Sequence, residues 1–399
     1  MTDDGLVARA AEQTASVTAL AQELIRLPSR AGVDDYGPVL AVLERWLGAR
    51  DLPHRRLHDE RGDLVGLLVE IEGGRPGRWW VLDACVDTAS FGDEDAWSFA
   101  PTSGEIRDGF LLGRGSADSK LPAAVFCHIA ADLQARAADL HGGLAVLLDV
   151  DEHTGGFGGA RAYLADPRAV RPAGVMIGYP GMEEVVVGGR GLWRARITVH
   201  APSGHSGSSR TVVGAVSRAA RLVQLLDDAE LPPGPLGGVG FPLRPKLTVT
   251  AIEGGQGFSV SPDRCDLNVD IRTTPAFDGT DAESLVRKAC AELDAAFPVP
   301  EPTQVTTIAC WPPFQLRPDE EPAAALLQAA RAVGLQVRPK VAGPSNIGNL
   351  LAGEGIPATA GFGLPYIGLH GTDERAHLAE LPLVHAAYHR AVLALLSAS

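Results

Sequence analysis

The stretch that decides the fold is LAVLLDVDEHTGG, Leu144–Gly156. It starts as a short, uninterrupted apolar run and ends in charged side chains and glycines. Uninterrupted apolar runs are typical of strands that are buried on both faces of a parallel sheet. Ligand sites in such sheets lie beyond the carboxyl ends of the strands. The stretch therefore predicts a buried strand that places Glu152 and His153 at the edge where a site forms.

Two further runs repeat this arrangement. WWVL (Trp79–Leu82) is followed by Cys85 and Asp87, and VMIG (Val175–Gly178) is followed by Tyr179. Segments with helical spacing of apolar residues, such as VTALAQELI and LPAAVFCHIAADL, precede or separate the runs. This alternation predicts an α/β domain with a mostly parallel, mixed sheet covered by helices.

The pattern changes near residue 190. The segments LWRARITVH, KLTVTAI and CDLNVDIR alternate apolar and polar side chains, as in an antiparallel sheet with one covered face. One helix is expected over 214–227 and another from TDAE, where Thr280 and Glu283 resemble a capping box. Helices beside a small antiparallel sheet indicate an α+β insert of the ferredoxin-like type. The expected domains are 1–189 and 305–399 for the α/β domain and 190–304 for the insert.

Composition narrows the class of protein. The formal net charge of −14 disfavours nucleic acid and anionic membranes as partners. No apolar run approaches the roughly 20 residues of a membrane-spanning helix, and the N-terminal residues have neither the basic nor the apolar region of a signal peptide. The five cysteines are scattered and odd in number, which disfavours a disulfide framework. These features predict a cytoplasmic protein.

Six motifs, in this order along nearly the whole chain, carry a family resemblance: CVDTASFGDEDAWSFAP, GRGSADSK, DEHTGGFGG, GHSG, VDIRTTP and LHGTDE. The chain resembles the dinuclear-zinc exopeptidases and amidohydrolases, such as acetylornithine deacetylase, succinyl-diaminopimelate desuccinylase, aminoacylase and glutamate carboxypeptidase. The resemblance implies a catalytic α/β domain with an inserted dimerisation domain, and hence a homodimer. It also implies metal-dependent hydrolysis of a small amide or peptide that carries a carboxylate.

The resemblance assigns metal-site roles to individual residues, and several of them depart from the family pattern. Cys85 replaces a histidine ligand, His153 replaces a carboxylate ligand, and Tyr179 replaces an acidic ligand before a proline. The bridging aspartate and the final histidine ligand are retained as Asp118 and His370. The family's two metal sites would then be Cys85–Asp118–Tyr179 and Asp118–His153–His370.

These two ligand sets are unequal. Two imidazoles and a carboxylate, with a fourth position open, form a good catalytic zinc site. A phenol with a pKa of about 10 is mostly protonated and is a rare ligand. We therefore expect one zinc ion, at Asp118, His153 and His370, while two ions or none, and manganese or cobalt in place of zinc, remain alternatives.

The resemblance also implies catalytic roles. Glu152 would be the general base that takes a proton from water and passes it to the leaving amine. His205 of the partner subunit would donate to the developing oxyanion. Asp87 would support the geometry of the site, although Cys85 offers it no imidazole N–H.

Three residues are candidates for binding the substrate. Asn346, in the loop GPSNIGN, could bind a carboxylate or carbonyl group. Arg272 either fixes a substrate carboxylate or pairs with a neighbouring strand residue, and Tyr179 lines the pocket or donates a hydrogen bond.

His385 and His389 have metal-like spacing on the last helix, but no motif supplies an acidic third ligand, so we interpret them as ordinary helix residues.

Three functions fit these observations. The first is a metal-dependent amidohydrolase or peptidase that cleaves a small N-acyl amino acid or a dipeptide-like amide. The second is a redirected enzyme on the same scaffold, which would carry out amide formation, elimination or isomerisation, with or without metal, and would use Cys85 as acid or nucleophile. The third is a non-catalytic binding protein, against which the retained Glu152 argues. Fold alone does not choose among them.

Overall fold

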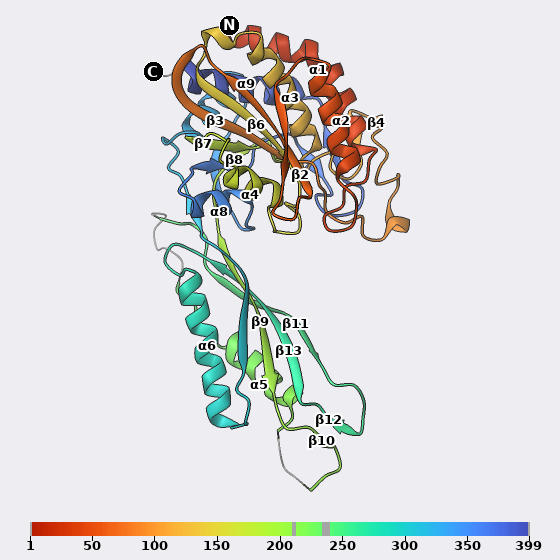
Figure 1. The fold of residues 1–399 in the computed structure, drawn as a ribbon, viewed down its shortest axis with the longest axis vertical. Coiled ribbons are helices and arrows are strands. Elements are labelled where there is room, and N and C mark those ends of the chain that lie inside the picture. Colours follow the sequence, from red (N-terminus) through yellow and green to blue (C-terminus); the bar gives the residue numbers. More distant parts are fainter. Residues whose placement is uncertain (1, 210–212, 234–239, 398–399) are drawn as a thin grey trace. The chain divides into compact units, whose positions relative to one another are not determined.

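The computed structural model describes residues 2–209, 213–233 and 240–397 and divides the chain into two compact units (Figure 1). Unit 1 comprises residues 1–188, 316–340 and 346–399, and unit 2 comprises residues 189–315 and 341–345. The predicted break between residues 304 and 305 falls at the start of strand β14 (Gln304–Trp311). That strand pairs with β9 inside unit 2, so unit 2 extends beyond the predicted boundary to residue 315.

Unit 1 contains a six-stranded mixed sheet in the order β1–β2–β6–β3–β7–β17. The strands β6, β3, β7 and β17 are mutually parallel, whereas β1 and β2 pair antiparallel at one edge. Their bounds are β1 His54–His58, β2 Leu64–Glu72, β3 Arg75–Cys85, β6 His141–Asp149, β7 Gly174–Ile177 and β17 Ala358–Thr359. The three apolar runs of the sequence lie in β3, β6 and β7, which confirms the predicted fold class.

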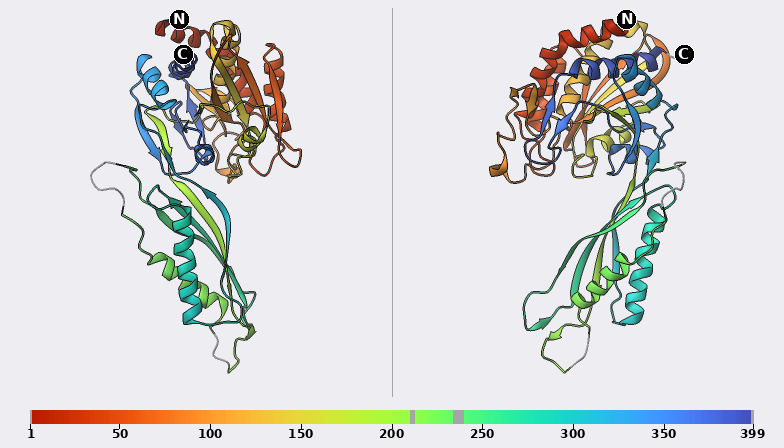
Figure 2. Two further views of the ribbon diagram at one scale, coloured as in Figure 1. Left: turned by 60° about the vertical axis from the view of Figure 1, so that its left-hand side comes forward. Right: turned by 180° about the vertical axis from the view of Figure 1, so that it is seen from behind.

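Helices cover this sheet (Figure 2). Their bounds are α1 Asp3–Ile25, α2 Gly37–Gly48, α3 Lys120–Gln134, α4 Gly158–Ala165, α7 Ala323–Ala332, α8 Ile347–Gly353 and α9 Leu381–Ser397. Helices α3 and α9 pack on β3 and β6, and α1 packs on both α3 and α9. No helix in the described ranges is long and apolar enough to span a bilayer.

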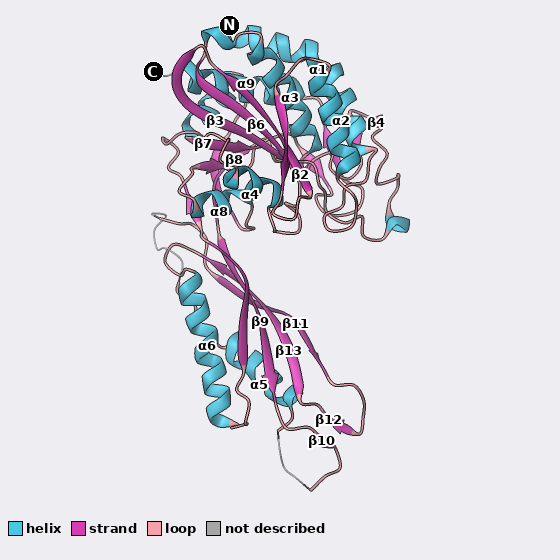
Figure 3. Cartoon of the chain, viewed as in Figure 1, coloured by secondary structure: helices cyan, strands magenta, loops and turns pink. Residues whose placement is uncertain are grey.

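Short strands complete the regions around the main sheet (Figure 3). One small sheet has the order β18–β19–β5–β4, with bounds β4 Ile106–Arg107, β5 Phe110–Leu112, β18 Tyr366–Ile367 and β19 Arg375–His377. Another has the order β15–β8–β16, with bounds β8 Glu184–Gly189, β15 Phe314–Gln315 and β16 Arg338–Ala342. Two short 3₁₀ helices are η1 Glu94–Ala96 and η2 Ala137–Asp139. In the sheet β18–β19–β5–β4, the pairing of β5 with β19 brings the segment before α3 close to the segment after β18.

Unit 2 is built around a four-stranded antiparallel sheet in the order β11–β13–β9–β14. Its main elements in chain order are β9 Gly191–His200, α5 Ala215–Asp227, β11 Lys246–Gly254, β13 Arg264–Thr273, α6 Gly279–Ala296 and β14. A separate two-stranded ribbon pairs β10 Gly204–His205 with β12 Val260–Ser261. A β-α-β-β-α-β order with this strand arrangement is the ferredoxin-like fold.

The alternation in the sequence produces the core of unit 2. Trp193, Ala195, Ile197 and Val199 of β9 are all buried, and they form one hydrophobic cluster with the inner faces of β13, α5 and α6. One detail of the prediction is wrong, because the capping box of α6 is formed by Asp278 and Asp281 and not by Thr280 and Glu283. The Asp278 carboxylate accepts hydrogen bonds from the first backbone N–H groups of the helix, so the helix begins one residue earlier than TDAE.

Three buried histidines lie where α3 and α9 approach α1. His385 and His389 stack on α9 with ring centroids 6.4 Å apart, and His128 on α3 has one ring nitrogen 2.9 Å from the Ser16 hydroxyl. Burial lowers the pKa of His128 and of His389 to about 4 and that of His385 to about 3. The nearby carboxylate of Asp132 does not reverse these shifts, because burial is the larger effect. All three imidazoles are therefore neutral in the folded protein at neutral pH.

We predict that acid destabilises unit 1 through these histidines. An unfolded histidine has a pKa of about 6.5, so below that pH the unfolded state binds protons that the folded state does not. Each histidine should then cost roughly 2 kcal/mol of unfolding free energy at about pH 5. Urea unfolding at a series of pH values between about 7 and about 5 measures this slope. His385→Leu should flatten it, whereas the same change at the exposed His58 should not; equal slopes in both variants would contradict the prediction.

Candidate metal centre

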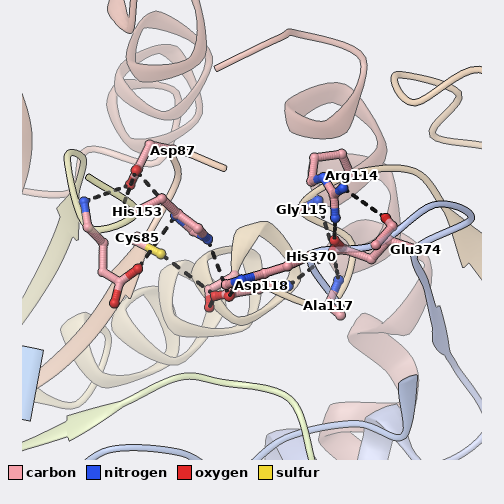
Figure 4. A network of polar contacts seen from close by, with 12 residues as sticks. Cys85, Asp87, Arg114, Gly115, Ala117, Asp118, His153, His370 and Glu374 are labelled. Atoms are coloured by element: carbon pink, nitrogen blue, oxygen red, sulfur yellow. Dashed lines mark hydrogen bonds and ion pairs between the residues drawn. The ribbon is translucent and has the colours of Figure 1, made fainter. Parts of the chain in front are cut away.

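The ends of three neighbouring strands bring the predicted residues together. Strand β3 ends at Cys85, β6 ends four residues before His153, and β7 ends two residues before Tyr179. In the sheet, Cys85 pairs with Asp149 of β6, and Asp83 pairs with Ile177 of β7, so the three carboxyl ends lie side by side. Asp118 comes from the turn before α3, and His370 comes from the loop between β18 and β19 (Figure 4).

The carboxylate of Asp118 is the centre of the cluster. Its Oδ2 atom lies 2.8 Å from Nε2 of His370 and 3.3 Å from Nε2 of His153. Its Oδ1 atom accepts a hydrogen bond from the Ser119 hydroxyl at 2.7 Å and faces the Cys85 sulfur at 3.9 Å. Burial alone would raise the pKa of Asp118, but the two imidazoles outweigh it and lower that pKa below its usual range. Asp118 is therefore ionised and ready to bind a cation.

Asp87 holds the turn that carries Glu152 and His153. Its fully buried carboxylate accepts the backbone N–H of His153 at 3.0 Å and that of Glu152 at 3.3 Å. The same carboxylate lies 3.2 Å from Nδ1 of His153. The sequence offered Asp87 no imidazole at position 85, and the structure supplies one from position 153 instead. A carboxylate that orients the far nitrogen of an imidazole is the usual support for a metal ligand.

The group Asp118–His153–His370 fits a metal ion. One ligand atom from each residue lies within 4.8 Å of the other two. The buried Nε2 atom of His153 faces Asp118 Oδ2 at 3.3 Å, and Nε2 of His370 faces the same oxygen at 2.8 Å. One carboxylate and two imidazoles are a donor set that zinc accepts with a fourth position open.

Burial and neighbouring charges shift the pKa values of His153 and Glu152. Burial would lower the pKa of His153, but the carboxylates of Asp118 and Asp87 prevail and raise it to about 11. Burial raises the pKa of Glu152 to about 8. The His153 imidazolium therefore supplies the positive charge that two buried carboxylates require, and a bound cation would take over that role.

Cys85, a member of the first predicted ligand set, lies 3.9 Å from the Asp118 carboxylate. The Cys85 sulfur also groups with Glu152 and His153, with ligand atoms within 4.8 Å of one another. Burial raises the pKa of Tyr179 above its ordinary value, so the phenol stays protonated. Burial also raises the pKa of the Cys85 thiol well above 9, and the carboxylates of Asp118 and Asp87 add to this effect.

Sequence reasoning missed Arg114 and Glu374, which form a buried clamp beside the site (Figure 4). One oxygen of Glu374 pairs with Arg114, and the other accepts the backbone N–H groups of Gly115 at 2.9 Å, Ala117 at 3.1 Å and Asp118 at 3.4 Å. Arg114 also donates to the carbonyl oxygen of Gly371 at 2.8 Å. The clamp thus ties the Asp118 turn to the His370 loop. Arg114 lies in the motif GRGSADSK and Glu374 in LHGTDE, so the family motifs could have pointed to both residues.

The other predicted residues have the following surroundings. His205 is exposed on β10 in unit 2, where its Nδ1 atom accepts the N–H of Gly207 at 3.0 Å. Arg272, also in unit 2, pairs with its strand neighbour Asp270 at 2.8 Å. In unit 1, Asn346 caps α8, and its side-chain oxygen accepts the N–H of Gly348 at 2.8 Å. For Arg272 and Asn346, these local bonds are sufficient structural reasons for the residue types.

The fold and the site together define a metal-dependent hydrolase that acts on C–N bonds, and comparisons with known proteins agree. Residues 84–394 match the model of the peptidase family M20/M25/M40. Over 385 residues the chain is 29% identical to a succinyl-diaminopimelate desuccinylase of Cereibacter sphaeroides, with 93% of this chain and 97% of that protein covered. The chain belongs to the peptidase family M20/M25/M40, which confirms the resemblance seen in the sequence.

Solved structures show the same fold. A tripeptidase from Staphylococcus aureus has a TM-score of 0.76 at 16% identity, and the match covers 96% of this chain and 99% of the tripeptidase. A dinuclear metal-binding peptidase from Bacillus subtilis has a TM-score of 0.72 at 14% identity, with coverage of 97% and 99%.

We predict that the clamp determines how tightly the site holds a metal. Glu374→Gln leaves the Arg114 charge buried without its partner and loosens both ligand loops. The affinity for zinc should therefore fall by about 10-fold or more, as measured by competition with a chromophoric chelator. Glu380→Gln is the matched control, because Glu380 pairs with His377 and touches neither ligand loop. Equal zinc affinity of the Glu374 variant and the control would contradict this role.

Proposed function

We propose that this protein is an amidohydrolase that cleaves a small N-acyl amino acid or a dipeptide-like amide with the help of one zinc ion. The observation that carries the proposal is the group Asp118–His153–His370, with the Glu152 carboxylate 3.5 Å from the His153 ring. A metal-dependent hydrolase needs a cation site and a base next to each other. Asp118, His153 and His370 would hold the ion, and Glu152 would be the base.

A zinc ion at this site would polarise the amide carbonyl and make water easier to deprotonate. Glu152 takes the proton from the attacking water and later delivers it to the leaving amine. Its position fits this role, because its carboxylate lies 3.5 Å from the His153 ring and therefore beside the proposed ion. Asp87 keeps Glu152 in place through the backbone N–H of that residue.

One ion is favoured over two because the ligand set Cys85–Asp118–Tyr179 is the weaker one. The protonated phenol of Tyr179 is a poor ligand. Without it, only Cys85 and Asp118 of this set remain, and Asp118 also belongs to the other ligand set. We place Tyr179 in the wall of the site. Manganese or cobalt in place of zinc would leave these roles unchanged.

The substrate and the assembly follow from the family resemblance. The substrate would carry a carboxylate, with Asn346 and Arg272 as candidate contacts. The protein would act as a cytoplasmic homodimer, in which the exposed His205 of the partner subunit donates to the developing oxyanion. The high pKa of the buried Cys85 thiol argues against Cys85 as the nucleophile of a redirected enzyme.

We expect Glu152→Gln to abolish hydrolysis without unfolding the protein. Loss of the general base should lower kcat by about 100-fold or more, while the zinc content and the thermal unfolding midpoint stay close to the original. Turnover of a panel of N-acyl amino acids and dipeptides measures the effect. The exposed Glu94 offers a matched control as Glu94→Gln. Full turnover in the Glu152 variant would reject this residue as the base.

Metal analysis tests the number of ions. Gently purified protein should contain one zinc ion per chain, and His370→Ala should lose it because the site keeps only one imidazole. His377→Ala is the control, since His377 lies in β19 outside the ligand group. Mass spectrometry of the protein before and after chelation gives the stoichiometry. Two tightly held ions per chain would show that the weaker ligand set also binds.

A further inference from the structure

We propose that Cys85, Glu152 and His153 form an inhibitory site for thiophilic divalent cations, such as cadmium or excess zinc. The inference rests on the proposed function, because it concerns a second use of the general base. Neither the family match nor the expected ligand sets assign this combination of residues. The tertiary structure brings them together from two strand ends.

The geometry suits a cation. The three residues offer a sulfur, a carboxylate oxygen and an imidazole nitrogen that all lie within 4.8 Å of one another. Cys85 is 5% exposed at the end of β3, and His153 lies beside it in the segment that follows β6 (Figure 4). The Nδ1 atom of His153 is 3.5 Å from Glu152 and 3.2 Å from Asp87. The Asp87 carboxylate thus lies next to the group and contributes negative charge there.

The sulfur decides which ions bind. Thiolates select soft metals such as zinc and cadmium over magnesium, calcium and manganese, which prefer oxygen. Coordination replaces the thiol proton of Cys85 with the metal, and that proton leaves to the solvent. The surrounding carboxylates of Asp87 and Asp118 attract the incoming cation and balance its charge. The proposed catalytic group contains no sulfur, so a sulfur-to-metal charge-transfer band distinguishes the two groups.

Occupation of this site must stop catalysis. A cation bound to the Glu152 carboxylate stabilises its ionised form, so this carboxylate accepts a proton from water much less readily. His153 belongs to both groups, so the second ion either shares its ring with the catalytic ion or displaces that ion. In both cases the base is lost. A thiophilic ion in excess over the catalytic one would thus act as an inhibitor.

Cadmium titration of protein loaded with zinc tests the proposal. Binding at Cys85 should produce a sulfur-to-cadmium charge-transfer band in the ultraviolet, together with loss of turnover. In Cys85→Ser the cadmium concentration that halves the rate, relative to the variant's own uninhibited rate, should rise by about 10-fold or more. Cys310→Ser is the matched control, because Cys310 is an exposed cysteine outside the site. It should remove any band from surface binding and leave the inhibition unchanged.

The outcomes separate this proposal from the proposed function. Equal inhibition of the Cys85 variant and the original protein would overturn the inhibitory site, as would a band that disappears only with Cys310→Ser. If no amide substrate is turned over, the proposed function fails, but the Cys85-dependent band still tests cadmium binding. If Cys85→Ser does not fold, Glu152→Gln replaces it, since loss of a carboxylate ligand should weaken cadmium binding measured by the same band.

Discussion

Burial of the Asp118 carboxylate is the constraint on which the site depends. A buried anion is costly unless charges and hydrogen bonds compensate it. His153 and His370 face one of its oxygens, and Ser119 donates to the other. Glu374 holds the Asp118 backbone N–H, so the turn cannot move away from its partners. The same arrangement that stabilises this anion also prepares a position for a metal ion.

The departures from the family pattern make sense as a rearrangement around Asp87. An imidazole is missing at Cys85 and a carboxylate ligand is missing at position 153, where the chain has histidine. Asp87 therefore contacts the imidazole of His153, which follows β6, and not an imidazole at position 85 at the end of β3. It still orients the ring. Glu152 keeps its place beside that ring. In the proposed function, the cluster thus loses the symmetry of two metal sites but retains the base and one complete ligand group.

Much of the fold was predictable because burial leaves a direct trace in a sequence. Uninterrupted apolar runs indicated β3, β6 and β7, and the strict alternation from Trp193 to Val199 indicated β9 and its covered face. The N-cap of α6 at Asp278 and the end of unit 2 beyond β14 were harder to predict from the sequence. Caps depend on which of several nearby acids reaches the free N–H groups, and a boundary depends on strand pairing between distant segments.

For the site, the sequence by itself determined the inventory: Asp118, Glu152, His153 and His370 at strand and loop ends, with Cys85 and Tyr179 as substitutions. Only the tertiary structure decided which of these residues meet. It grouped Cys85 with Glu152 and His153, and it gave Asp87 an imidazole from another strand. It also revealed the Arg114–Glu374 clamp across 260 positions of chain. Residue types set what chemistry is available, whereas distances between side chains arise only when distant segments pack together.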